Sequence, residues 1–405
     1  MKQLFFRPLS ITGIILLLST QGATAAQVQP QAAKTRQMLE QQQRKIDQLE
    51  QKLDAVMALY EENSSTGEST SSGSQSTTQI GGYGELHYRN LDTSNGSGRD
   101  KEINFKRLVL LLSHQFNKRL RLSSELEVEN VVASSNPGDQ GEVEVEQAYL
   151  EYDLNADHHV RGGLLLVPAG ILNETHEPPT FYGVQRNPVE SYIIPTTWSV
   201  NGIGLSGELA PGLSYTLDLH EGIKTTSNNN YAIRGGRQQG MKADAHDLAS
   251  TGRLKWTALP GVELAATVQY QQDVTQGEDP NVGQAWLFES HAVINRGPLG
   301  LRALYARWML SGRGPGNIGA DRQEGFYIEP SLKVTPHVGL FSRYSRWDNQ
   351  AGNGRRSQSE NTQYNIGMNW WPHQDVVVKA DYQGQENDDH TTEQDGLNLG
   401  IGYQF

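Results

Sequence analysis

The residues that could carry out chemistry are scattered along this chain and match no catalytic pattern. The 405 residues include eleven histidines and no cysteine, which excludes a cysteine nucleophile and a thiolate zinc site. His87, His114, His220 and His291 fall in segments with strand periodicity, and none stands in a recognisable nucleophile motif. The glycines of residues 312–316 lack the strand-turn-helix setting of a phosphate-binding loop. We therefore expect no enzymatic activity, no cofactor and no bound metal.

Charged side chains at alternate positions indicate instead a polar surface built from strands. Glu125, Glu127 and Glu129 alternate with Leu126 and Val128, and successive side chains of a strand point to opposite faces. The same period of two recurs at residues 213–219, 262–270 and 376–382. The polar faces that can be assigned carry five basic and nine acidic residues, which are Arg121, Arg253, Lys255, Lys333 and Lys379 against Glu125, Glu127, Glu129, Glu151, Asp153, Asp218, Glu263, Glu329 and Asp381.

The composition suits a membrane β-barrel better than a soluble core. Hydrophobic residues make up 36% of the chain, there are 42 glycines, and the formal net charge is −12. The acidic balance disfavours nucleic acid as a partner, and a mean hydropathy of −0.58 excludes a bundle of membrane helices. In a barrel only alternate residues face lipid, so the average stays polar. A wall with excess carboxylate around water predicts a weak preference for cations, unless the charges pair across strands.

The connections favour the barrel over a soluble sandwich, in which strands would also alternate. Seven tight turns rich in Pro, Gly and Asn separate eight longer polar segments, which gives sixteen strands over residues 79–405. Short turns at one end and long loops at the other are typical of outer-membrane barrels. We expect an all-β fold, a sixteen-stranded antiparallel transmembrane barrel. The seven tryptophans lie near predicted strand ends, as expected for aromatic girdles at the membrane interfaces.

Three places fit this pattern poorly. Residues 107–112 and 301–310 are apolar on both faces, so their inward and outward sides cannot be assigned. Pro330 lies on an apolar strand face and has no N–H group for the sheet, which predicts a bulge or a shorter strand there.

The longest connection, residues 168–197, is too apolar and too rich in proline for a floppy exterior loop. Long loops of this kind are usually functional. We expect it to fold into the barrel and narrow the pore, with Glu174, His176, Glu177, Arg186 and Glu190 near the constriction. The alternative is a cap or a subunit contact outside the pore.

The residues before the barrel predict export and a stalk. Lys2 and Arg7 precede a short apolar run and a small-residue site at Ala23-Thr24-Ala25, so residues 1–25 read as a cleaved signal peptide rather than a membrane anchor. Residues 26–62 contain an apolar seam with heptad spacing, which predicts a short α-helical coiled coil acting as a periplasmic oligomerisation stalk, or a single amphipathic helix. Residues 63–78 are a Ser/Thr-rich linker.

The last strand carries the most specific signal. Leu397, Leu399, Ile401, Tyr403 and Phe405 share one face of it. An apolar face ending in phenylalanine resembles the C-terminal assembly signal of Gram-negative outer-membrane proteins. By this resemblance, Tyr403 and Phe405 engage the barrel-assembly machinery.

Together these features resemble a trimeric Gram-negative porin, and the chain is most similar to the phosphate-selective porin O and P family. The resemblance covers residues 79–405 and implies an outer-membrane location in contact with lipid, a homotrimer and an inward third loop. The family's anion selectivity rests on a ladder of arginines and a ring of lysines. No such ladder is evident here, although Arg234, Arg237 and Lys242 cluster in the fourth long loop. We therefore expect passive diffusion of small hydrophilic solutes and ions. The alternatives are an adhesin-type structural barrel and an anion-selective porin.

Overall fold

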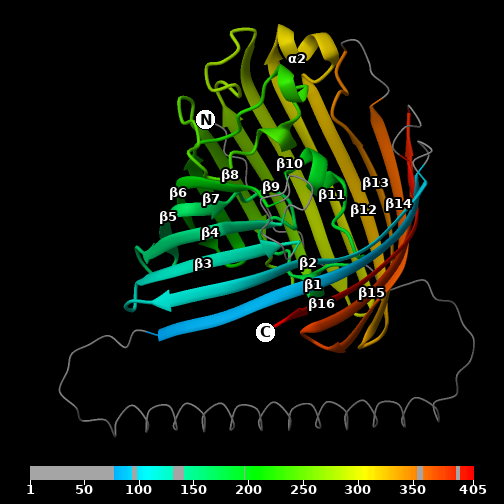
Figure 1. Ribbon diagram of the computed structural model, residues 1–405. Coiled ribbons are helices and arrows are strands. Elements are labelled where there is room, and N and C mark those ends of the chain that lie inside the picture. Colours follow the sequence, from blue (N-terminus) through cyan, green and yellow to red (C-terminus); the bar gives the residue numbers. More distant parts are fainter. Residues whose placement is uncertain (1–76, 94–97, 131–140, 196, 354–358, 389–392) are drawn as a thin grey trace, which may run out of the picture. The chain divides into compact units, whose positions relative to one another are not determined.

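Sixteen antiparallel strands form a closed barrel in the computed structural model, which describes residues 77–93, 98–130, 141–195, 197–353, 359–388 and 393–405 (Figure 1). Each strand pairs with its neighbours in sequence, and β1 pairs with β16 to close the sheet. The predicted sixteen-stranded barrel is confirmed. The predicted signal peptide and coiled coil, and all but the last two linker residues, lie outside the described residues. The strands are β1 (Thr77–Thr93), β2 (Gly98–Gln115), β3 (Leu120–Glu129), β4 (Glu142–Asp153), β5 (His158–Leu166), β6 (Ser199–Ala210), β7 (Leu213–His220), β8 (Ala249–Trp256), β9 (Val262–Gln271), β10 (Val282–Arg296), β11 (Leu299–Gly312), β12 (Arg322–Thr335), β13 (Val338–Asp348), β14 (Glu360–His373), β15 (Val376–Asn387) and β16 (Gln394–Gln404).

The connections alternate in length as the sequence predicts. All seven predicted tight turns join consecutive strands, and Gly212, Gly261 and Gly297 adopt positive φ angles of 74°, 73° and 58° in three of them. The first and last long loops are shorter than predicted, because β1, β2 and β15 extend into them. Within the described loops lie the short helices η1 (Pro178–Thr180), η2 (Val189–Ile193), η3 (Ser227–Asn229), η4 (Ile233–Gly236) and α2 (Arg313–Ile318). None of the described helices is long and apolar enough to span a membrane.

Burial assigns the faces that the sequence left ambiguous. In β2, Arg107 and Val109 are buried inside the barrel, whereas Leu108, Leu110 and Leu112 are 36–44% exposed on the outer face. In β11, Leu304, Ala306, Trp308 and Leu310 point inward, and Tyr305 and Met309 point outward. Both faces of β11 are apolar because its inner face packs against a loop rather than against water.

Pro330 neither shortens β12 nor causes a bulge, so that prediction is wrong. The strand continues through Pro330, which lies opposite Leu301 of β11. On the other side the pairs Ile328–Tyr344 and Ser331–Phe341 keep one register with β13. The ladder with β13 omits residues 329 and 330, which accommodates a proline without an N–H group.

Apolar side chains fill the side of the lumen along β10–β13. The inner loop, residues 167–198 between β5 and β6, packs against the inner faces of β10–β13 and against residues of the β7–β8 loop. We call this group the lumen cluster; its largest members are Trp198, Trp308, Tyr327, Trp347, Ile193, Ile194, Ile223 and Ile233. The inner loop runs inside the barrel (Figure 1), and its buried apolar residues belong to the lumen cluster.

Three of the seven tryptophans therefore do not belong to an outer aromatic girdle. Trp198 and Trp308 are fully buried and Trp347 is 4% exposed, all within the lumen cluster. Trp370, in contrast, is 47% exposed on the outer face. Proximity to a strand end does not determine whether a tryptophan points into or out of the barrel. The three tryptophans that point inward are covered by the lumen cluster.

Replacing Trp308 with alanine should destabilise the barrel by about 3–5 kcal/mol, because it leaves a cavity in the lumen cluster. The matched change Trp370→Ala on the outer face should cost about 1 kcal/mol or less. Guanidinium-induced unfolding in detergent, followed by tryptophan fluorescence, measures both. Equal losses of unfolding free energy for the two variants would contradict a packed lumen cluster.

Candidate functional site

Away from the lumen cluster, the lumen holds a polar cavity of about 360 Å³. Its wall comes from β14–β16 and β1–β4, which follow one another around the closed sheet, and the inner loop and the β7–β8 loop supply the other lining residues. Glutamines of β14–β16 supply uncharged amides at Gln363, Gln383, Gln385 and Gln394. The charged lining residues are Glu85, Glu127, Glu129, Glu142 and Glu144, and Arg89, Lys106, Arg107, Arg186, Arg234 and Arg237.

The inner loop is organised around one buried carboxylate, Glu190. Its Oε1 accepts hydrogen bonds from the backbone N–H groups of Ile171 and Leu172, at 2.5 and 2.7 Å. Its Oε2 accepts from Asn187 Nδ2 at 2.7 Å and from the Tyr327 hydroxyl at 3.0 Å. Glu190 is 3% exposed and is not among the residues that line the cavity. The sequence placed it near the constriction, but its four hydrogen bonds show that it holds the loop together.

Side chains of the barrel wall hold the middle of the inner loop. Arg343 on β13 donates to the carbonyls of Tyr182 and Gln185, at 2.7 and 3.3 Å, and pairs with Glu329 on β12 at 2.7 Å. Asp381 on β15 accepts from the backbone N–H of Val184 at 2.7 Å. These contacts join the loop to strands far from its own ends, so the loop crosses the inside of the barrel.

Neighbouring contacts complete this attachment. Trp308 Nε1 on β11 donates to the carbonyl of Ile193 at 3.1 Å. The Lys379 ammonium on β15 lies 3.5 Å from the centre of the Phe181 ring, a cation–π contact. Backbone carbonyls of the loop thus find donors on the wall, which a loop buried away from water requires.

His176 attaches the loop to the acidic wall of β3 and β4. Its Nε2 lies 3.2 Å from Glu146 Oε2 and 3.6 Å from Glu125 Oε1, and all three residues are buried. Arg107 on β2 donates to the His176 carbonyl at 3.1 Å, and the Tyr83 hydroxyl donates to Glu125 at 2.8 Å. The sequence analysis missed Glu146, because it lies at a β-bulge where Gln147 also faces inward.

Two groups of side chains have the donor types of a metal site. The ligand atoms of Glu125, Glu146 and His176 lie within 4.8 Å of one another. Beside this cluster the Arg107 guanidinium donates to the His176 carbonyl at 3.1 Å and pairs with Glu85 at 2.7 Å. In the second group, Glu151, Asp153 and His159, both carboxylates already pair with Arg121.

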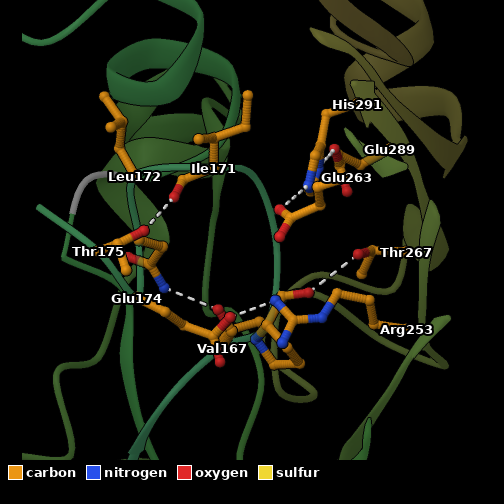
Figure 2. Close-up of polar contacts among 12 residues, drawn as sticks. Val167, Ile171, Leu172, Glu174, Thr175, Arg253, Glu263, Thr267, Glu289 and His291 are labelled. Atoms are coloured by element: carbon orange, nitrogen blue, oxygen red, sulfur yellow. Dashed lines mark hydrogen bonds and ion pairs between the residues drawn. The ribbon is translucent and has the colours of Figure 1, made fainter. Parts of the chain in front are cut away.

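A second attachment fixes the start of the inner loop to β8 and β9 (Figure 2). Glu174 forms an ion pair with Arg253, and the Thr267 hydroxyl donates to the carbonyl of Pro168 at 2.9 Å. Beside them His291 lies between Glu289, at 2.7 Å, and Glu263, at 3.3 Å (Figure 2). The structure thus brings together Glu174 and Arg253, which the sequence assigned separately to the loop and to the wall.

The remaining predicted residues lie at different depths of the lumen. Arg121 pairs with Glu151 and Asp153, and Glu129 pairs with Lys106. Lys333 lies 5.3 Å from the Trp371 ring near the short turns, and Lys255 is half-buried on the inner face of β8. Glu177 is half-buried within the inner loop and is not among the cavity-lining residues, whereas Arg186 lines the cavity.

The terminal aromatic residues lie on the outer face, as their alternation predicts. Phe405 is 68% exposed. A Cβ atom at Gly84 would lie 2.8 Å from the Tyr403 hydroxyl oxygen, and one at Gly82 would lie 3.0 Å from the Phe405 ring. Glycines on β1 thus make room for both rings of the closing strand β16.

Loop arginines are the functional residues that sequence reasoning placed least well. Arg237 donates to the carbonyl of Thr197 at 3.1 Å, and Arg234 donates to the carbonyl of Ser191 and lies 5.5 Å from the Tyr192 ring. The cluster of basic residues in the fourth long loop was visible in the sequence, but its position at the cavity was not. With six arginines and lysines against five glutamates, the cavity lacks the excess of carboxylate counted on the strands.

Ion pairs and hydrogen bonds hold that arginine-bearing loop in place. Lys224 lies 2.5 Å from Asp244 and 2.6 Å from Glu278, which belongs to the next long loop. The hydrogen bond from Lys224 holds the pKa of Asp244 below its ordinary value. The Tyr231 hydroxyl donates to Asp279 at 3.0 Å. The position of Arg234 and Arg237 over the inner loop is therefore built into the fold.

Comparison with known proteins identifies the family. The chain belongs to the family described as phosphate-selective porin O and P, whose model matches residues 79–405. An uncharacterised protein of Aquifex aeolicus is 32% identical over 337 residues, which is 76% of each chain. The protein is therefore an outer-membrane channel.

Solved outer-membrane proteins share the fold at low sequence identity. An anion-selective porin from Comamonas acidovorans has a TM-score of 0.57 and 13% identity, covering 82% of this chain and all of its own. The channel DcaP of Acinetobacter baumannii has a TM-score of 0.56 and 14% identity, covering 84% and 99%. The trimer form of OmpT from Vibrio cholerae has a TM-score of 0.54 and 12% identity, covering 82% and 99%.

The substitution Glu190→Gln should loosen the inner loop without unfolding the barrel. An amide cannot accept all four hydrogen bonds, and a loss of about 2 kcal/mol corresponds to roughly thirtyfold more frequent local opening. Hydrogen exchange of peptides from residues 168–197 measures this. Glu177→Gln is the control, because the Oε2 atom of Glu177 has no hydrogen-bond partner within the described part of the chain. Unchanged exchange in the Glu190 variant would exclude its organising role.

Proposed function

We propose that this outer-membrane channel conducts small hydrophilic solutes and ions passively through the polar cavity, and that the inner loop sets its narrowest section. The observation that carries the proposal is the division of the lumen. The lumen cluster fills the side of β10–β13, and the inner loop faces the charged wall across a cavity of about 360 Å³. In this proposal, a solute that crosses the barrel passes through this cavity.

The balance of charge supports weak ion selectivity. The strand residues alone predict a preference for cations, but the loops add Arg186, Arg234 and Arg237 to the same cavity. Opposite charges that line one passage largely cancel in their effect on the mean potential. This arrangement supports neither strong cation selectivity nor the phosphate selectivity in the family's description.

Removing one sign of charge should shift the selectivity in a known direction. The triple change Glu127→Gln, Glu142→Gln and Glu144→Gln should favour anions, and the double change Arg186→Gln and Arg237→Gln should favour cations. We expect a change in the permeability ratio of about twofold or more in each case. Reversal potentials of single channels in a salt gradient measure it, with Arg296→Gln at a short turn as the control. Shifts of the same sign in both variants would contradict conduction through this cavity.

The competing function is an adhesin-type structural barrel, whose lumen is closed. Planar-bilayer conductance of the purified protein distinguishes the two, since a closed barrel conducts no ions even when the loops and the stalk are intact.

We also propose that the mature protein is a homotrimer with a periplasmic N-terminal stalk. The heptad spacing in residues 26–62 and the trimer form of the similar Vibrio cholerae protein support it. The signal-like residues 1–25 support export, and the outward Tyr403 and Phe405 suit recognition by the barrel-assembly machinery.

Deletion of residues 26–62 should weaken the trimer, so that it dissociates at a lower detergent concentration or a lower temperature. Native gel electrophoresis measures the oligomeric state, and conductance shows whether each barrel remains open. A trimer of unchanged stability would remove the stalk from the determinants of assembly.

A further inference from the structure

One histidine and two glutamates meet inside the barrel, where the inner loop contacts β3 and β4. The Nε2 atom of His176 lies 3.2 Å from Glu146 Oε2 and 3.6 Å from Glu125 Oε1. The three residues are 3%, 0% and 3% exposed, respectively. In a tetrahedral site with metal–ligand bonds of about 2.0–2.1 Å, neighbouring ligand atoms lie about 3.3–3.4 Å apart. Both separations from the histidine therefore fit ligands that share a small divalent cation.

The other ring nitrogen of His176 indicates which tautomer faces the carboxylates. Its Nδ1 lies 3.2 Å from the backbone carbonyl of Asn173. A carbonyl can only accept a hydrogen bond, so Nδ1 carries the proton. Histidines that bind metals usually donate their second N–H group to an acceptor of this kind. In the neutral ring, Nε2 then presents a lone pair to two carboxylate oxygens, and this arrangement requires a cation between them. That cation is either a proton or a metal ion.

The charge around these three residues favours a divalent cation over a proton. Arg107 pairs with Glu85 at 2.7 Å, so its charge is largely balanced there. The inner loop supplies one positive charge, from Arg186. Three carboxylates of β3 and β4 face these groups, namely Glu125, Glu127 and Glu146. Among these described side chains, three negative charges against one positive charge leave an excess of two, which a divalent cation balances and a single proton does not.

Glu146 also has an oxygen that can still accept a ligand. It is fully buried, and its Oε1 atom has no hydrogen-bond partner among the described residues. A buried carboxylate oxygen without a donor is costly, because it has lost its water. The neighbouring Glu127 lies beside Glu146 and also lines the polar cavity. A cation in the cavity therefore has a path to the carboxylate that lacks a partner.

We propose that His176, Glu125 and Glu146 bind one zinc ion, which joins the inner loop to β3 and β4. One imidazole nitrogen with two or three carboxylate oxygens suits Zn²⁺. Calcium takes six to eight oxygen ligands at longer distances, which this small group does not supply. The sequence pattern did not indicate the site, because its donors come from three separate segments of the chain.

Zinc binding to the full-length protein, purified without a histidine tag and dialysed against EDTA, tests the proposal. Isothermal titration should give one zinc ion per chain. The variants His176→Gln and Glu146→Gln should each bind zinc about a hundredfold more weakly or worse. His159→Gln is the matched control, since His159 also lies beside two carboxylates, but both of these pair with Arg121. Absence of zinc binding by the wild type, which leaves a proton in this position, overturns the proposal. Equal losses in the His176 and His159 variants also overturn it.

Two further measurements keep the test decisive. Zinc should slow hydrogen exchange of peptides from residues 168–197 severalfold in the wild type and have no effect in the His176 variant. Unchanged exchange in the zinc-loaded wild type overturns the attachment of the loop by the metal. Heat-modifiable gel mobility shows whether each variant folds; if His176→Gln does not, Glu125→Gln takes its place and should lose zinc to the same extent. Displacement of zinc by an equal concentration of calcium indicates a non-specific carboxylate site and overturns the proposal. None of these measurements depends on ion conduction.

Discussion

The structure depends on the absence of water in the membrane interior. Backbone N–H and C=O groups there have to pair within the protein, and a sheet satisfies them only if it closes on itself. The pairing of β1 with β16 provides that closure. Closure also fixes the direction of every side chain, because the outer face has to suit lipid and polar residues then have to point into the lumen. Sixteen strands leave a lumen too wide to be filled by wall side chains alone, so the interior of this barrel has to be built by loops.

The inner loop occupies that interior through two different interactions. On the side of β10–β13 it buries apolar side chains in the lumen cluster, which supplies most of the driving force. Toward β13–β15 its backbone accepts hydrogen bonds from Arg343 and donates one to Asp381, and Glu190 accepts from the N–H groups at its start. Charge-assisted hydrogen bonds of this kind contribute roughly 1.5–3 kcal/mol each. The apolar side determines where the loop lies, and the polar side determines its conformation.

The difference between the inner and outer faces of the barrel also explains where its charged residues lie. Inside, carboxylates of β3 and β4 face arginines that arrive from two loops, so that the polar cavity holds both signs. Outside, the exposed side chains of the described strands are mainly apolar, and Arg307, Arg322 and Arg346 lie toward the end that carries the long loops. Charge on the lipid face is best tolerated near the membrane interfaces, where its cost falls to about 0–1 kcal/mol. The lumen and the outer wall therefore present different chemistry from alternate residues of the same strands.

Local periodicity determined the strands, their number and the seven tight turns, because alternation and turn preferences depend on neighbours in sequence. It also placed Glu174, His176 and Arg186 on the loop that enters the lumen. Only the tertiary structure decided that Glu190 organises the loop rather than the pore, that Trp198, Trp308 and Trp347 face inward, and that Arg234 and Arg237 reach the cavity. Each of these depends on a contact between segments many residues apart. Alternation with a period of two shows that a strand has two faces. Packing across the closed barrel determines which loop covers the inner face.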